Sequence, residues 1–530
     1  MLAGCSSTDG TPTPTPGDGD GDGDGDDNGD GTETPADVGR ELPSDLEEPG
    51  TREEYLQRAN LVLNVEAPWI FLNRQYSVYG KSTRVNWTAR ADETIKGYAI
   101  EPTDGNSVTI TQSQMDSGLD PHDHRETPTQ NIVTQTYEGL LGRDADGRIV
   151  NELATGYERS GDAEVTFELR SGVSFHSGDS FTAEDAAYSI NRIVQPGVGG
   201  LESPQSDQLA GVTGAEAGSD STVVVSTDGF NPTVFALFAS YCDIMNMSWV
   251  ESNDAAYINS NMDGTGPFQL ETYEQDVQVV FESYGDYWRD AAPADQLTIQ
   301  AAGESSTRVN QLLSDETDII VNVPPQSISQ VQGSDNAEIA ATPSTRVIYN
   351  AMIYNAEPFD SVEFRQAMNY AVDMESIVEN ILSGFADVTA QPTLENFAGH
   401  NTEIDPYPYD PDQAEALVEE SGYAGAEITL HTPVGRYLQD LEIAQAVVGY
   451  IDELPNVSAE VQQRDFGNLA GELTDGDIST GPDFYLIGWG NTTFDASQTI
   501  IPLLTSNGAL TSYSNEQVDS LMNSAQSRIE

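Results

Sequence analysis

The chain has 530 residues, of which 88 are acidic and 21 basic, and its formal net charge is −67. That length allows about three structural units, and 37% apolar residues are too many for a wholly disordered chain. The charge argues against nucleic acid as a partner, because phosphates are bound by Lys and Arg, and against a polybasic patch on an anionic membrane.

The acidity runs through the whole chain. Residues 6–50 hold 14 acids and one base, which leaves −54 for residues 51–530. The only lysines are Lys81 and Lys96. Concentrated salt shortens the Debye length to ~3 Å at 1 M and so screens such self-repulsion. We interpret the chain as halophilic, of haloarchaeal type; an acidic chaperone or cation buffer is the alternative.

The first fifty residues predict a tether. Residues 2–5 resemble a lipobox, in which the thiol of Cys5 takes a lipid. Residues 1–5 would be its remnant, and the Thr/Pro and Gly/Asp repeats of residues 6–50 predict a disordered acidic stalk. Gly/Asp repeats also resemble calcium loops, but no flanking scaffold or terminal Glu is evident. The sequence has no run of 18 apolar residues. We therefore expect a lipid-anchored protein at the extracellular face of the membrane.

The rest of the chain predicts a mixed α/β fold. Strand-like alternation occurs over residues 107–112 and 165–170. An amphipathic helix over residues 182–193 begins with Thr182 as its N-cap and acids in its first turn. Further helices are predicted over residues 51–63, 363–372 and 411–421.

Signals for catalysis are weak. His122 and His124 have a spacing suited to a metal, but they lie in a polar loop. No Gly-x-Ser-x-Gly elbow is present. Two cysteines are too few for a disulfide framework, and Cys242, near several aromatic residues, is interpreted as a small buried hydrophobe. We expect no catalytic residue, no metal and no cofactor.

A known family shares many of these segments. Residues 165–189, VTFELRSGVSFHSGDSFTAEDAAYS, closely resemble the signature of family 5 extracellular solute-binding proteins, the dipeptide- and oligopeptide-binding subunits of ABC importers. Further landmarks of the family follow the same order along residues 106–530: 119–121, 137–141, 153–154, 264–268, 287–288, 359–373 and 483–489.

The resemblance implies an α/β, two-lobed fold of the periplasmic-binding-protein type, class II, with two crossing strands as hinge. We place these strands near residues 346–355 and 68–79. Lobe I would comprise residues 68–150 and 264–355, with residues 151–263 as an extra subdomain. Lobe II would comprise residues 356–530 and a helix over residues 51–67.

One segment departs from the family's order. The chain ends with a helix near residues 515–530, where the family's C-terminal tail is expected to begin, and residues 51–79 resemble that tail. We interpret this as a circular permutation, which adjacent chain ends make tolerable. A lineage-specific extension is the alternative. If the permutation is correct, Tyr55, Leu56 and Trp69 should pack beside the last helix.

The resemblance also implies the function. A small solute, a peptide in the first place, would be captured between the lobes by a monomer and delivered to an ABC permease with its own ATPase subunits. Nickel chelates and oligosaccharides are alternative solutes. Two other functions are alternatives. A receptor-coupled sensor would have the same fold, and a secreted hydrolase would need a nucleophile–base pair.

Candidate solute contacts follow from the resemblance and from the residue types that line such clefts. Trp489 stands first, because Gly488 and Gly490 let the backbone come close. Peptide-binding members carry an Asp three residues after this Trp, where this chain has Thr492. Asn491 or Asp495 would have to substitute for it. Four further candidates come from elsewhere in the chain: Arg346, either a carboxylate fork or a hinge ion pair, and Met115, Asp120 and Tyr137 from lobe I.

Overall fold

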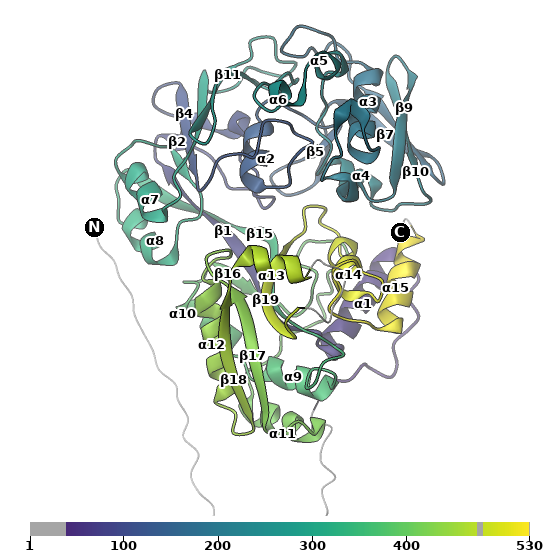
Figure 1. Ribbon diagram of the computed structural model, residues 1–530, viewed down its shortest axis with the longest axis vertical. Coiled ribbons are helices and arrows are strands. Elements are labelled where there is room, and N and C mark those ends of the chain that lie inside the picture. The colour runs from purple at the N-terminus through teal and green to yellow at the C-terminus, as the bar shows by residue number, and fades with distance from the viewer. Residues whose placement is uncertain (1–38, 474–480, 529–530) are drawn as a thin grey trace, which may run out of the picture. The chain divides into compact units, whose positions relative to one another are not determined.

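The computed structural model describes residues 39–473 and 481–528. Two long strands, β1 (Trp69–Ser82) and β15 (Ala337–Met352), form its centre. They pair antiparallel from Trp69 opposite Ala351 to Ser82 opposite Ala337, with two register shifts on the way. Both strands pass between lobe I and lobe II (Figure 1). They lie where the sequence placed the two crossing strands.

One mixed sheet extends from these strands into both lobes. Its order is β11-β12-β13-β4-β14-β1-β15-β19-β17-β18, with β16 also on β1. The lobe I strands are β4 (Ser107–Gln112), β11 (Phe268–Glu274), β12 (Gln278–Ser283), β13 (Gln296–Ala301) and β14 (Ile319–Ile320). The lobe II strands are β16 (Ala386–Val388), β17 (Ala426–Pro433), β18 (Val457–Arg464) and β19 (Phe484–Gly490).

A separate four-stranded sheet builds the extra subdomain. Its order is β7-β8-β10-β9, and its bounds are β7 (Ala154–Gly161), β8 (Glu164–Leu169), β9 (Val212–Ser219) and β10 (Thr222–Thr227). Helix α3 (Ala183–Val194) covers it and begins with the expected cap, in which Thr182 accepts the Asp185 N–H. The subdomain's apolar cluster runs from Leu140 to Ile244, whereas residues 245–262 pack into the core of lobe I. This corrects the expected limits of 151 and 263.

The remaining elements of lobe I are short. They are β2 (Val85–Asn86), β3 (Glu101–Pro102), β5 (Leu141–Arg143), β6 (Ile149–Asn151), α2 (Thr127–Val133), α4 (Val234–Phe238), α5 (Met247–Ser252), α6 (Ala255–Ile258), α7 (Ser305–Leu313) and α8 (Pro325–Gln332), with single turns of 3-10 helix at Gly97–Ala99, Val198–Gly200 and Ser206–Leu209.

Most helices of lobe II cover its part of the sheet. They are α1 (Arg52–Glu66), α9 (Val362–Tyr370), α10 (Met374–Asn380), α11 (Pro411–Ser421), α12 (Asp440–Asp452), α13 (Phe466–Leu473), α14 (Ser497–Leu504) and α15 (Glu516–Gln526). Among the helices of the described ranges, none is long and apolar enough to cross a bilayer.

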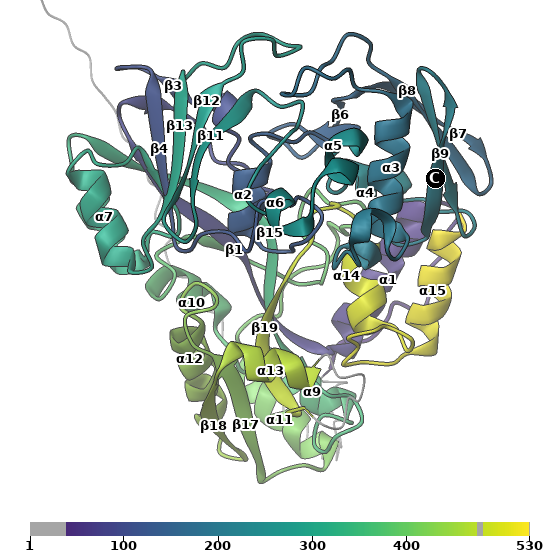
Figure 2. The same ribbon diagram turned by 45° about the horizontal axis from the view of Figure 1, so that its top comes forward.

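Helix α1 packs beside α15, although the end of α1 and the start of α15 are 450 residues apart in the sequence (Figures 1 and 2). Leu56 and Trp69 share one buried cluster with Val518 and Leu521. At the end of α15, the guanidinium of Arg528 lies 4.4 Å from the ring centroid of Tyr55. The segment that begins with α1 is therefore part of the lobe II core and of the hinge.

The segment before α1 has a defined course from residue 39. The Arg40 guanidinium donates to Asn64 at 2.7 Å and to the Asp405 carbonyl at 2.9 Å, and it lies 3.8 Å from the Tyr407 ring centroid. These contacts attach residues 39–42 to lobe II. The predicted disordered stalk over residues 6–50 is corrected to this extent, while residues 6–38 and Cys5 lie outside the described residues.

Candidate functional site: a cleft between the lobes

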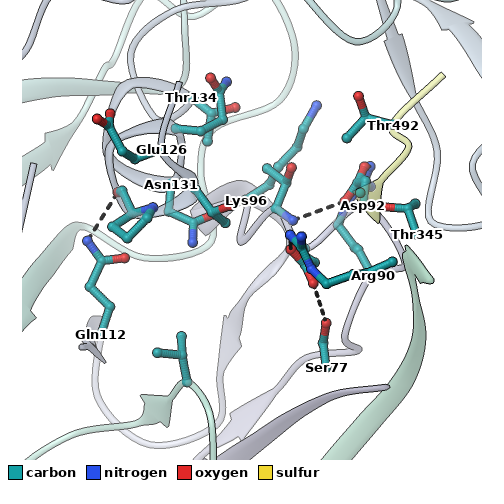
Figure 3. A pocket seen from close by; sticks show the side chains of 18 of the residues that line it. Ser77, Arg90, Asp92, Lys96, Gln112, Glu126, Asn131, Thr134, Thr345 and Thr492 are labelled. Carbon is teal, nitrogen blue, oxygen red and sulfur yellow. Dashed lines mark hydrogen bonds and ion pairs between the residues drawn. The ribbon is translucent and has the colours of Figure 1, made fainter. Parts of the chain in front are cut away.

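A cleft of about 1150 Å³ opens between the two lobes. Strands β1, β15 and β19 line it, together with the chain around α2, the start of α7 and the loop of residues 435–439. Ser77, Arg90, Lys96 and Thr345 stand around this space, with Thr492 on its lobe II side (Figure 3). The cleft thus borders both the hinge strands and the two lobes that they join.

The end of β19 forms the lobe II wall. The Trp489 indole N–H donates to the Gln498 carbonyl at 3.1 Å, which fixes the ring on the cleft side of α14. Gly490 pairs with Arg346 across β15, and a Cβ at position 490 would lie 3.3 Å from the Arg346 guanidinium. Glycine therefore leaves room for this arginine.

A second arginine extends the same wall. The buried Asp440 carboxylate accepts the backbone N–H groups of Gly435, Arg436 and Tyr437, which holds the loop in its turn. The Tyr437 ring then packs on Gly488, where a Cβ would meet it at 2.9 Å. Arg436 stays exposed at the cleft, 4.7 Å from the ring centroid of Phe466.

Arg346 has one weak acidic partner. Its guanidinium lies 3.5 Å from the Glu93 carboxylate, which also accepts the Ser77 hydroxyl at 3.2 Å. An ideal arginine–carboxylate fork makes two hydrogen bonds of about 2.8 Å. Most of the hydrogen-bonding capacity of Arg346 is therefore open to a solute.

Two ion pairs of the lobe I wall are shorter than the 3.5 Å contact between Arg346 and Glu93. Arg90 binds Asp92 (Figure 3). Lys96 lies 3.0 Å from Glu152. Burial would raise the pKa of Glu152, but Lys96 holds it below its usual value. Glu138 accepts hydrogen bonds from Tyr287 and Trp288 at 2.8 Å, and burial together with the charge of Glu152 raises its pKa to about 7.

Most charged side chains that line the cleft, of both signs, belong to lobe I and the hinge strand β15. Eight of the 21 basic residues line the cleft but only seven of the 88 acids. The basic residues are Arg90, Lys96, Arg125, Arg143, Arg289, Arg308, Arg346 and Arg436. The acids are Asp92, Glu93, Glu126, Glu138, Glu152, Asp243 and Glu304. All seven acids precede residue 356, so in the described part of lobe II no acidic side chain lines the cleft.

Four of the residues singled out from the sequence line this cleft: Trp489, Gly490, Arg346 and Tyr137. Tyr137 is almost fully buried, and its hydroxyl accepts the Asp263 N–H at 3.3 Å. It forms part of the floor under the cleft rather than a freely exposed contact.

The other four lie in the packed interior, outside the residues that line the cleft. Asp495 makes a buried bidentate pair with Arg52 at 2.8 and 2.9 Å, and Asp120 makes one with Arg192. Asn491 donates to the Asp495 carbonyl at 2.8 Å, so it shapes the loop after β19. Met115 is buried in the lobe I cluster. These placements correct the expected solute contacts, because each polar group already has a partner inside the protein.

Most residues that line the cleft were not singled out from the sequence, and Arg436 and Asp243 are two examples. Arg436 carried a weak signal, since it is one of only four basic residues after position 355. Asp243, beside Cys242, carried none, because no local pattern distinguishes it from the many other acids. Cys242 itself is buried, as predicted.

The two histidines of the 122–124 loop belong to the packing of lobe I. His122 Nε2 lies 2.7 Å from the Asp243 carbonyl, and both histidines are buried. Within the described ranges, no three His, Cys, Asp or Glu side chains are grouped to hold a metal ion.

Comparison with known proteins identifies the family. Residues 148–511 match the family described as bacterial extracellular solute-binding proteins, family 5 Middle. The chain is 27% identical over 456 residues to the glutathione-binding protein GsiB of Pectobacterium atrosepticum, covering 82% of this chain and 85% of that one.

Solved structures share the fold. HbpA2 from Haemophilus parasuis superposes with a TM-score of 0.68 at 20% identity, over 80% of this chain and 89% of that one. The ABC transporter-associated periplasmic binding protein DppA from Helicobacter pylori, in complex with the peptide STSA, has a TM-score of 0.63 at 18% identity, over 80% and 90%. These relatives are binding proteins rather than enzymes. With its two lobes, its interlobe cleft and a family match over residues 148–511, the chain belongs to the family 5 extracellular solute-binding proteins of ABC transporters.

Proposed function

We propose that the protein captures a small solute with at least one carboxylate, a short peptide in the first place, and delivers it to the permease of an ABC importer. The observation that carries this proposal is the lobe II wall of the cleft. That wall presents Arg436, Trp489 and Tyr437 beside Arg346 of the hinge strand β15, and among the described lobe II residues that line the cleft there is no acid.

The composition of lobe II makes this wall unusual. Residues 356–530 hold 30 acids and four bases, and Arg436 is one of those four. An anionic group approaching any other face of this lobe meets mainly carboxylates. Arginine binds carboxylates through paired hydrogen bonds, and aromatic walls bury the apolar parts of a solute. Arg346, Arg436, Trp489 and Gly490 are therefore the proposed contacts on this side, with Tyr137 beneath the opposite wall.

A peptide also has an amino group, and among the described residues only the opposite wall offers it carboxylates, which stand there among six basic side chains. All seven acids that line the cleft belong to lobe I or to the hinge strands. Thr492, which stands where peptide-binding members have an Asp, offers an ammonium group no charge. A solute held by its carboxylate at lobe II and by its amino group at lobe I contacts both lobes. Such a solute favours the closed form by its differential affinity.

The relatives support this class of solute. Glutathione, named for the GsiB relatives, is a tripeptide with two carboxylates, and DppA was solved with a peptide. A nickel chelate, an oligosaccharide or a role as sensor would use the same fold. Mass spectrometry of material that purifies with the protein separates these solutes.

The experiment is a calorimetric titration with three probes: glutathione, trialanine and trialanine amide. We expect the amide, which lacks the carboxylate, to bind at least tenfold more weakly than trialanine. Arg436→Gln should remove most of that difference, because it removes one carboxylate partner. Arg464→Gln, a lobe II arginine paired with Glu472 away from the cleft, is the matched control and should bind like the natural protein. Equal affinities for trialanine and its amide would contradict the proposal.

We further propose that the protein is a lipid-anchored monomer of a salt-rich environment. The lipobox around Cys5 supports the anchor, and the charge of −67 supports the environment. Such a tether would hold the cleft outside the membrane beside the permease.

We also propose that residues 51–101 are the family's C-terminal tail in permuted order. Two observations support this. Helix α1 packs beside α15, and Arg528 lies over Tyr55, so the two ends of a former continuous segment remain adjacent.

A further inference from the structure

The loop after β19, residues 491–494, leaves lobe II and lies against lobe I. The hydroxyl groups of Tyr241 and Thr492 lie 2.8 Å apart, and the Ser240 hydroxyl donates to the Thr492 carbonyl at 2.8 Å. Arg143 donates to the Thr493 carbonyl at 2.9 Å. These hydrogen bonds connect the lobes independently of the two hinge strands.

Phe494 anchors the same loop by packing. The Arg143 guanidinium lies 4.8 Å from its ring centroid, and a Cβ on Gly147 would meet the ring at 2.6 Å. The Phe494 backbone has a φ of 58°, a conformation that is costly for an aromatic residue. The surrounding contacts therefore have to hold this loop in place.

Gln498 on α14 joins these contacts to the solute wall. Its side-chain amide donates to the Tyr241 hydroxyl at 3.0 Å and accepts the Thr493 N–H at 3.2 Å. Its backbone carbonyl accepts the Trp489 indole N–H at 3.1 Å. One residue of lobe II is therefore bonded both to lobe I and to the aromatic wall of the cleft.

Most of the groups that make these contacts are uncharged hydroxyl, amide and carbonyl groups. Arg143 is the only charged member, and it bonds carbonyl oxygens rather than a carboxylate. Each lobe carries a formal charge of −27, counting residues 68–355 for lobe I and residues 51–67 with 356–530 for lobe II. The repulsion between the lobes weakens as salt rises, whereas hydrogen bonds between neutral groups change little.

We propose that Tyr241 and Gln498 are positioning residues that latch the 491–494 loop to lobe I and so couple lobe closure to the orientation of Trp489. When the lobes separate, the Tyr241 contacts break first, and Gln498 is free to shift with α14. The Trp489 ring then loses the support that holds it against the cleft.

Tyr241→Phe in the full chain tests the latch without any solute, because it removes only the bridging hydroxyl. Tyr273→Phe is the matched control, since its hydroxyl donates to Asp116 within lobe I at 2.7 Å. We expect Tyr241→Phe to raise the open population at least fivefold, because two interlobe hydrogen bonds of ordinary net strength, to Thr492 and from Gln498, are lost. Small-angle scattering should then show a larger radius of gyration, and the Trp489 emission, isolated by subtraction of a Trp489→Phe protein, should shift to longer wavelength.

A double-mutant cycle with Thr492→Val sharpens the test. Both substitutions remove the hydrogen bond between Tyr241 and Thr492, so their combined effect on the open population should be smaller than the sum of the two single effects. Thr492→Ser keeps the hydroxyl and should behave like the natural protein. Additive effects, or a Tyr241→Phe protein that matches Tyr273→Phe in both readouts, would overturn the latch. Because every readout is made without solute, that outcome leaves the proposed function standing, and a failed solute titration leaves the latch standing.

Discussion

At the scale of single residues, Asp243 is an acid of the cleft whose negative charge the surrounding protein compensates poorly. No Lys or Arg of the described ranges lies within ion-pair distance of its carboxylate, although Lys96 is near enough to favour its charge. Burial and the neighbouring Glu152 raise its pKa to about 6, against a partial compensation by a hydrogen bond from Gln130. The folded protein therefore keeps a costly negative charge here at neutral pH.

Asp243→Asn should reveal that cost as a pH-dependent stability. The folded pKa lies above the unfolded value of about 3.9, so the natural protein loses stability as pH rises from about 4 to 6. Asparagine carries no such penalty. We expect the variant's free energy of unfolding to gain on the order of 2–3 kcal/mol relative to the natural protein between pH 4 and pH 7. Urea unfolding at each pH measures this, with the exposed Glu202→Gln as control; a difference that stays constant with pH would contradict it.

Residue roles were the least predictable feature from sequence. Trp489 and Gly490 were found because an aromatic residue between glycines at a strand end is a local signal. The sequence around Asp495 and Asp120 does not distinguish them from cleft residues. In the fold, however, each is paired with a buried arginine. The arginine that binds Asp495 is Arg52, 443 residues away, and such a pairing exists only in the folded chain.

At the scale of elements, local signals were reliable. Thr51 and Thr182 begin helices with reciprocal capping hydrogen bonds, and Pro411 begins α11 behind the Asp410 cap, each within a residue or two of the prediction. The position of β1 at the centre of the sheet was predicted only through the family resemblance. Its partner β15 lies more than 250 residues further on, and no periodicity in either strand identifies the other.

The adjacency of α1 and α15 makes a rearranged chain a direct test of the permutation. A protein that begins at residue 104, in the exposed turn after β3, and joins residue 528 to residue 51 through a short Gly/Ser linker retains every strand. We expect it to fold, because Arg528 already contacts Tyr55, and to melt within about 10 °C of the natural order. Circular dichroism during heating measures this.

The control for that experiment is the same chain without residues 51–103. It lacks β1, which pairs with three other strands, and should not fold cooperatively. A rearranged chain that fails like this control would count against the interpretation of residues 51–101 as a displaced tail.

At the scale of the whole molecule, the large negative charge is only partly compensated within the fold. Each lobe carries −27, and within the described ranges only 14 contacts join a Lys or Arg to a carboxylate. Most carboxylates therefore face solvent or one another. The net charge could be counted from the sequence without knowledge of the fold, whereas dependence of the fold on salt stays a prediction.

The free energy of unfolding should accordingly rise with salt over the range in which salt screens carboxylate repulsion. The Debye length falls from about 30 Å at 0.01 M to about 3 Å at 1 M, so the steepest gain is expected below 1 M. The urea midpoint, measured in increasing KCl, is the readout. Sucrose at matched osmolality is the control, since it lowers water activity without screening charge. A midpoint that is independent of KCl, or that sucrose raises equally, would mean that self-repulsion does not limit stability and would remove the physical basis for a salt-rich environment.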